Sequence, residues 1–168
     1  MIKLINGRGQ MGEAIKERLS EVPQIKESVY IYHTWNFENK SKYIQLIEFN
    51  KLLSFVDKYY KHKIIFISTT AEGDTHYTHY KQKAEAYLIN KCERAIILKF
   101  PPLIGKKGIL TKLKKKEVEP IGIIDLIPMD DAVDSILEKI KYRGLTRSFS
   151  FKGEMIKATT VQKLLNYE

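Results

Sequence analysis

The sequence predicts an α/β protein in which helices cover both faces of a mostly parallel sheet. Two observations lead to this prediction. Apolar runs of strand length alternate along the chain with longer segments in which apolar residues recur at helical spacing. The 168 residues contain no internal repeat and no low-complexity linker, and this length suits one domain that covers 1–168.

Each expected element follows from its residues. The run Lys63–Ile67 is apolar almost throughout, as in a strand that is buried on both faces. Pro101 and Pro102 end another expected strand, at 95–98, because proline is not tolerated inside a central strand. In chain order, the expected elements are a strand at 2–5, a helix that carries Met11, Ile15 and Leu19, a strand at 29–32, a helix with an apolar face from Tyr43 to Val56, a strand at 63–67, a helix at 75–91, a strand at 95–98, a lysine-rich loop at Lys106–Lys116, a strand at 121–127, a helix capped by Asp130, a final strand at 148–151 and a short helix at 159–166.

Composition limits the compartment and the partners. The single cysteine, Cys92, excludes an internal disulfide framework and suits the reducing cytosol. No apolar run reaches the roughly 18 to 20 residues that span a bilayer, and the N-terminus leads directly into a strand pattern. We therefore expect a cytoplasmic protein without a membrane partner. The formal charge of +9 favours anionic partners such as nucleotides, sugar phosphates or nucleic acid.

A glycine-rich turn follows the first expected strand. Gly7, Gly9 and Gly12 have the spacing at which a tight turn, a close approach to phosphate and close helix packing each require glycine. The following helix would offer free N–H groups to an anion. Two interpretations are open, a phosphate or dinucleotide site and an ordinary structural turn. Arg8 suits an extra 2′-phosphate, or it is an exposed, solvated side chain.

A second group of residues has the pattern of proton-transfer chemistry. Tyr77 and Lys81 are four apart on an expected helix and therefore lie on one face. A nearby ammonium favours the phenolate and would lower the tyrosine pKa from about 10. Thr70, at the end of the third strand, could bond a substrate oxygen in the same cleft. Taken alone, this spacing is common on solvated helix faces.

Several segments resemble one enzyme family in the right order. The helix Tyr77–Leu88 is similar to the Tyr-x-x-x-Lys-x-x-Ala-Glu-x-x-Leu helix of extended short-chain dehydrogenases/reductases, the sugar-nucleotide epimerases, dehydratases and reductases. The strand at 66–70 resembles the one that supplies their catalytic Ser or Thr, and 97–105 resembles the strand and loop after the catalytic helix. The segment 127–132 resembles their later Val-Asp-Asp segment, and residues 9–12 are close to the Gly-Gln-Leu-Gly of dTDP-sugar reductases.

The resemblance implies a Rossmann-like three-layer αβα fold that binds NAD or NADP. Tyr77 would be the catalytic acid/base, Lys81 would lower its pKa and hold the ribose hydroxyls, and Thr70 would orient the substrate. Hydride would pass between nicotinamide and a nucleotide-linked sugar or another phosphorylated small molecule, with a residual substrate-side segment at about 104–127. The implied cofactor-binding residues are Gly7, Arg8, Gly9, Gln10, Met11, Gly12 and Lys81. The family often dimerises through the helices that correspond to 43–61 and 75–91, so a homodimer is expected.

The chain also departs from the family pattern. The region of strands 2 and 3, which holds the adenine and its ribose in the family, is missing between the glycine turn and Val29–His33. The acidic residue expected after the second strand is absent, since His33, Thr34 and Trp35 occupy its place. An alternative function is therefore a non-catalytic protein that binds a nucleotide or a protein partner and has lost the adenosine half of the cofactor site.

The other polar residues predict simpler roles. The histidines show no metal-ligand spacing, so no metal site is expected. Trp35 is expected to be a packing residue, and Glu85 a solvated residue paired with Lys81. Asp130 and Asp131 suit helix capping better than catalysis. Lys106–Lys116 is expected to be a solvated loop or a phosphate contact, and no nucleic-acid partner is expected because no recognised nucleic-acid module accompanies it.

Overall fold

A five-stranded parallel sheet forms the centre of the protein. A computed structural model describes residues 1–33, 35–105 and 109–166. The strands are adjacent in the order β1-β2-β3-β4-β7, and every pair is parallel. Their bounds are Ile2–Ile5 (β1), Val29–Tyr32 (β2), Lys63–Thr69 (β3), Ala95–Phe100 (β4) and Arg147–Ser150 (β7). The predicted α/β, mostly parallel architecture is confirmed.

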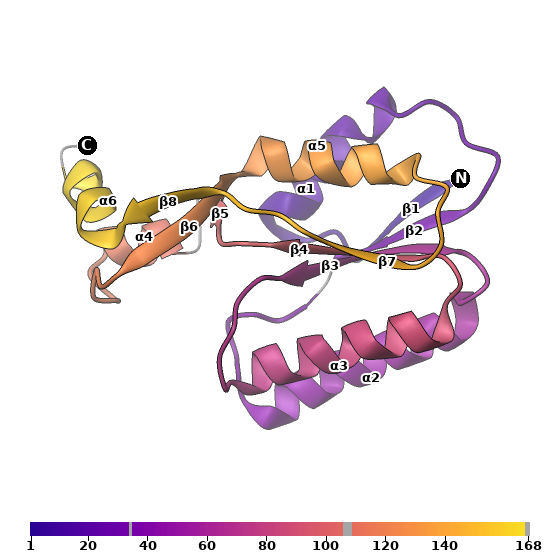
Figure 1. Ribbon diagram of the computed structural model, residues 1–168, viewed down its shortest axis with the longest axis horizontal. Helices are drawn as coiled ribbons and strands as arrows, with labels where there is room; N and C mark the ends of the chain where they lie inside the picture. Colours follow the sequence, from indigo (N-terminus) through magenta and orange to yellow (C-terminus); the bar gives the residue numbers. More distant parts are fainter. Residues whose placement is uncertain (34, 106–108, 167–168) are drawn as a thin grey trace.

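Helices cover both faces of this sheet and complete three layers (Figure 1). On one face lie α1 (Gly9–Arg18), which continues into a 3₁₀ turn at Leu19–Glu21, and α5 (Met129–Ile140). On the other face lie α2 (Lys42–Tyr59) and α3 (His76–Lys91). Because side chains alternate along a strand, each strand contributes to two cores.

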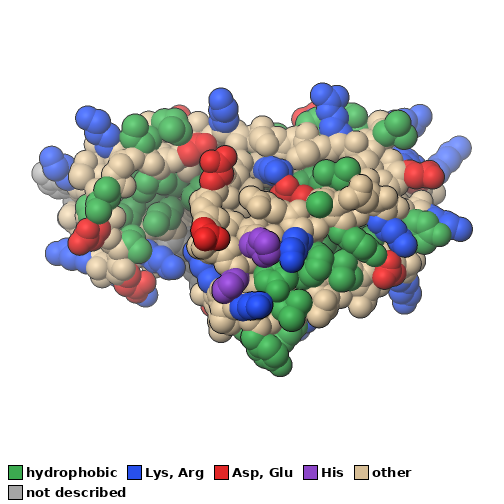
Figure 2. All heavy atoms as spheres, turned by 60° about the horizontal axis from the view of Figure 1, so that its bottom comes forward, with side chains coloured by type: hydrophobic (Ala, Val, Ile, Leu, Met, Phe, Trp, Pro, Cys, Tyr) green, Lys and Arg blue, Asp and Glu red, His purple; other side chains and the backbone are tan. Residues whose placement is uncertain are grey.

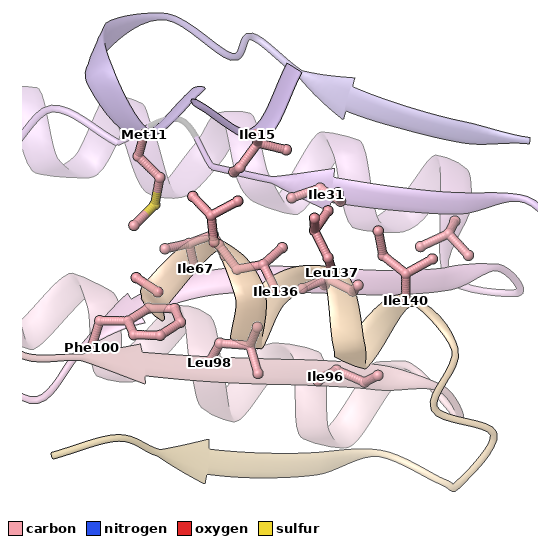
Figure 3. Packing of buried hydrophobic residues seen from close by; sticks show 14 of the residues in the cluster. Met11, Ile15, Ile31, Ile67, Ile96, Leu98, Phe100, Ile136, Leu137 and Ile140 are labelled. Carbon is pink, nitrogen blue, oxygen red and sulfur yellow. The ribbon is translucent and has the colours of Figure 1, made fainter. Parts of the chain in front are cut away.

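The two cores can be followed along β3. Ile65 and Ile67 belong to the core under α1 and α5. Figure 3 shows Ile67 there together with Met11 and Ile15. Ile64 and Phe66 point the other way and pack with residues of α2 and α3. This two-sided burial explains why the four residues from Ile64 to Ile67 are all apolar, as the sequence predicts.

The connection from β1 to β2 has an unusual hand. The steps β1–β2 and β2–β3 go the same way across the sheet, yet α1 and α2 lie on opposite faces (Figure 1). Two such connections must have opposite hands. The connections through α2 and α3 are right-handed, which holds for about 98% of such units, and the connection through α1 is therefore left-handed. This arrangement fits the predicted loss of the strand 2–3 region, because β1 and β2 are now direct neighbours at one end of the sheet.

A small lobe extends from the carboxyl end of the sheet (Figure 1). It consists of a second sheet in the order β5-β6-β8 and of two helices, which enclose a core of Leu113, Leu126 and Val161. Its elements are β5 (Leu103–Ile104), α4 (Ile109–Lys114), β6 (Ile123–Pro128), β8 (Glu154–Lys157) and α6 (Ala158–Leu165). The segment expected at 104–127 thus folds together with residues from the C-terminal part of the chain.

Three local predictions are wrong, and the strand β5 is missed. Part of the expected loop at Lys106–Lys116 forms α4, while 106–108 lie outside the described residues. The strand at 148–151 is not the final one, because β8 follows it. Asp130 does not cap α5, since the helix begins at Met129 after Pro128, and Asp130 lies in its first turn. The short β5 has no counterpart among the expected elements.

No helix among the described residues is both long enough and apolar enough to cross a membrane.

Candidate functional site

The glycine turn combines an open backbone with a closely packed helix. Gly9 has a φ of +80° and nothing lies within 4 Å of the position of a Cβ atom there, so the backbone is open to a close ligand. A Cβ on Gly12 would lie 2.4 Å from the carbonyl carbon of Gly7, so α1 approaches the turn closely only because Gly12 lacks a side chain. Gly9 and Gly12 thus have the open backbone and the close helix packing for which the predicted spacing requires glycine.

The N-terminus of α1 faces this turn. The helix begins at Gly9 after Arg8, whose side chain makes no capping hydrogen bond within the described part of the chain. The N–H groups of the first turn are therefore available to an anion, and the helix dipole favours negative charge there. Gln10 in this first turn reaches Gly105, because its Oε1 lies 2.5 Å from the position of a Cβ atom there.

His33 links the glycine turn to the rest of the site. It directly follows β2, and its ring bonds to the backbone of Arg8. Burial lowers the pKa of His33 to about 4, and the positive charge of Lys81 acts in the same direction. The imidazole is therefore neutral at physiological pH, and its buried Nδ1 has no hydrogen-bond partner among the described residues. Sequence reasoning gave His33 no role, because its neighbours come from other elements.

Tyr77 and Lys81 lie one turn apart on α3, as predicted. Thr75 caps this helix in a reciprocal pair with Thr78, which fixes the turn that carries Tyr77. The Lys81 side chain is only 4% exposed, and its Nζ donates a hydrogen bond to the carbonyl oxygen of Ile67 in β3 at 2.7 Å. Nζ lies 6.0 Å from the centroid of the Tyr77 ring.

The predicted lowering of the Tyr77 pKa is contradicted. Burial raises the pKa of Tyr77 to about 12, and no attraction to Lys81 offsets this effect. Burial also lowers the pKa of Lys81 to about 7, although Glu85 and Glu48 act in the opposite direction. A buried ammonium that is itself poorly solvated gives the phenolate little support. Tyr77 is therefore a protonated phenol at neutral pH.

Glu85 is not the solvated residue that the sequence predicts. It is buried, and its carboxylate accepts a hydrogen bond from Ser68 at 2.6 Å and pairs with Lys99 at 2.5 Å. Ser68 and Lys99 are register partners on β3 and β4. Glu85 thus fastens α3 to both strands. Its only effect on Lys81 among the described interactions is electrostatic, since its charge raises the Lys81 pKa.

Thr70 lies just beyond β3 and is half-buried. Its backbone N–H donates to the carbonyl oxygen of Phe100, so the described contacts tie Thr70 to β4 rather than to Tyr77. A hollow of about 450 Å³ lies beside the first turn of α3 and is lined by Lys40, Asp74, Thr75, His76 and His79. Figure 2 shows histidine and lysine side chains together on the main body, near the space that separates it from the small lobe.

Trp35 is buried, as predicted for a packing residue, but its neighbours could not be foreseen. Lys81 Nζ lies 4.8 Å from the centroid of the Trp35 ring and 4.6 Å from the centroid of the Phe66 ring. The indole Nε1 donates to Oε1 of the fully buried Gln45 at 2.7 Å. Aromatic rings and a carbonyl oxygen therefore enclose the Lys81 ammonium. No signal in the sequence joins Trp35 to Lys81.

No group of three or more potential metal ligands occurs in the described ranges, 1–33, 35–105 and 109–166.

Comparisons with known proteins show the fold. No protein-family model and no curated protein sequence matches this chain. The structure is similar to that of the Bordetella bronchiseptica enzyme WbmG in complex with NAD and UDP, with a TM-score of 0.73, 12% identity and coverage of 99% of this chain and 77% of that chain. It is also similar to dTDP-glucose 4,6-dehydratase from Bacillus anthracis in complex with NAD (TM-score 0.70, 12% identity, 99% and 80% covered). A dTDP-4-dehydrorhamnose reductase from Clostridium acetobutylicum gives the same TM-score of 0.70, at 12% identity and with 98% and 80% covered. At such identities the shared property is the Rossmann-like fold, here in a shorter form.

Proposed function

We propose that this chain is a compact NAD(P)-dependent oxidoreductase or epimerase that acts on a nucleotide-linked sugar. The observation that supports this most is the placement of the glycine turn and of Tyr77 at the same edge of one sheet. The turn follows β1, and α3 begins after β3, with only β2 between these strands. Ligands of such sheets collect at this carboxyl edge. The enzymes with a similar fold include a dehydratase and a reductase of dTDP-sugars, which is consistent with the proposal.

The residues present fit the phosphates of a dinucleotide. The open backbone at Gly9 and the free N-terminus of α1 suit a pyrophosphate, with Gly7–Gly12 as the binding segment. When bound, the nicotinamide would supply or accept the hydride. Tyr77, protonated at neutral pH, would donate a proton to the carbonyl oxygen of the substrate, a role that suits reduction. Thr70 would orient that oxygen, and Lys81 would hold the ribose.

A second candidate function is a non-catalytic nucleotide-binding or partner-binding protein. Two observations favour it. The enclosed Lys81 does not present its ammonium to a ligand in this structure. The parallel sheet also ends at β1, so the strands that would carry the adenosine half are absent from it.

The substitution Tyr77→Phe separates the two functions. With a nucleotide sugar and NAD(P)H, the enzyme proposal predicts a loss of turnover on the order of 100-fold or more, because the proton donor is removed. The matched control is Tyr87→Phe, which removes a phenol of the same helix that bonds Asp57 away from this edge. Equal turnover of Tyr77→Phe and the wild type, or no dinucleotide binding by titration calorimetry, would refute the enzyme function.

A further inference from the structure

Trp35 occupies one side of Lys81 within the proposed site. The indole is 8% exposed, stands 4.8 Å from Lys81 Nζ and meets the Phe66 ring edge-on at 6.0 Å. In its charged form, which predominates below its pKa of about 7, the Lys81 amine is attracted to the aromatic face at this distance. The ammonium has a second partner in the carbonyl oxygen of Ile67, so its interactions are satisfied inside the protein.

The segment that carries Trp35 is held firmly in this position. Gln45, fully buried in α2, accepts from the indole and donates to the carbonyl oxygens of Asn36 and Asn39 at 2.7 and 2.6 Å. The side chain of Asn36 in turn accepts from the backbone of Glu38 and Asn39. This network makes the position of Trp35 a built feature of the fold, because moving it would leave buried polar groups of Gln45 without partners.

We infer that Trp35 competes with the ribose of a bound dinucleotide for Lys81, and that Trp35 is thereby a residue that determines ligand specificity. This inference rests on the proposed function. A ligand that needs only the glycine turn, such as pyrophosphate, is unaffected by Trp35. A ligand that also needs Lys81 must displace the indole from the ammonium. The free energy needed to break these contacts lowers the affinity of that ligand.

Titration calorimetry tests this with the full chain. Trp35→Ala is expected to bind NAD or NADP about tenfold more tightly than the wild type, a difference that cation–π contact and indole burial together can supply. Its affinity for pyrophosphate is expected to be unchanged. Trp35→Phe is the matched control, because a ring remains over Lys81 and only the bond to Gln45 is lost. Its dinucleotide affinity should stay close to that of the wild type.

A double variant shows whether the gain comes from Lys81. Adding Lys81→Met to Trp35→Ala should abolish the increase in dinucleotide affinity and leave pyrophosphate binding intact. If the gain persists in the double variant, or if Trp35→Ala, folded by circular dichroism, binds the dinucleotide no more tightly than the wild type, the competition is refuted.

The wild type gives an independent signal, since Trp35 is the only tryptophan of the chain. Saturation with a dinucleotide is expected to shift its fluorescence to longer wavelength as the indole leaves its buried position, whereas pyrophosphate should leave the emission unchanged. Dinucleotide binding without any change of emission would overturn the inference while leaving the proposed function standing. Failure of the proposed function is read separately, from the turnover of Tyr77→Phe.

Discussion

His33 shows how one buried side chain can couple stability to pH. Burial lowers its pKa from the ordinary 6.5 to about 4, so between these values the unfolded chain binds more protons than the folded protein. The stability contributed by the neutral ring is present above pH 6.5 and is lost as the pH falls towards 4.

The variant His33→Gln should therefore be less sensitive to acid. The glutamine amide keeps a donor near the backbone of Arg8 but does not titrate. Between pH 7 and pH 4, the free energy of unfolding of the wild type should fall by about 3 kcal/mol more than that of the variant. Urea unfolding at several pH values measures the difference. Parallel pH profiles of the two proteins would contradict the shifted pKa.

At the residue scale, the sequence predicts the chemistry of the glycines better than that of the charged groups. The roles of Gly9 and Gly12 depend on local backbone geometry, which their spacing already indicates. The pKa values of Tyr77 and Lys81 depend instead on burial, and the rings that enclose Lys81, Trp35 and Phe66, come from distant parts of the chain. Tertiary contacts of this kind cannot be derived from spacing on one helix.

At the scale of elements, the prediction succeeds where a segment is buried on both sides. The strand β3 has an unmistakable apolar pattern because both faces are covered. In β8, only Ile156 packs against the core of the small lobe, and two of its four residues are charged. In α4, Leu113 alone is fully buried among solvated lysines. Such weakly patterned segments become ordered only through their neighbours in the lobe.

The capping residue of α3 provides a test at this scale. Thr75→Ala removes the side chain that accepts from the Thr78 N–H and should lower the free energy of unfolding by about 1 kcal/mol. Thr75→Ser should retain most of the stability, because its hydroxyl can form the same bond. Thr160→Ala is the control, because it replaces a threonine at an exposed position within α6 without removing a helix cap. Thermal unfolding measures all three variants. A Thr75→Ala protein as stable as the wild type would show that the cap contributes nothing.

The close approach of α1 to the glycine turn gives a second test. A Cβ on Gly12 would meet the backbone of Gly7, so Gly12→Ala must push the helix away from the turn. Pyrophosphate affinity should fall about tenfold or more as the N–H groups lose their alignment. Titration calorimetry measures the change. Unaltered pyrophosphate affinity in a folded variant would show that the turn does not bind phosphate.

At the scale of the whole molecule, the layer of α2 and α3 suits a homodimer. Tyr43 and Leu46 of α2 and Ile89 of α3 are 71%, 39% and 52% exposed. Hydrophobic side chains are visible over this layer in Figure 2, among positively charged ones. Tyr43 and Leu46 lie in the first turns of α2 and Ile89 in the last turn of α3, and exposed apolar residues of this kind often mark a contact surface.

Light scattering coupled to size-exclusion chromatography tests the dimer directly. The wild type should elute as a dimer, and Leu46→Glu combined with Ile89→Glu should give a monomer, because two charges would be buried in the contact. Leu145→Glu, at a 78% exposed position outside these helices, is the control and should leave the dimer intact. A wild type that is monomeric at every concentration would refute the predicted dimer.

The left-handed connection through α1 has a consequence for the order in which the chain assembles. The right-handed units from β2 to β4 bury their strands against α2 and α3, whereas β1 pairs with one neighbour at the end of the sheet. We expect β1 and α1 to dock last and to open first, so their amide protons should exchange with solvent sooner than those of β3. A phosphate ligand at the turn would hold this edge in place and slow that exchange. If phosphate binds at the turn, its binding and the completion of the sheet are expected to be two aspects of one step.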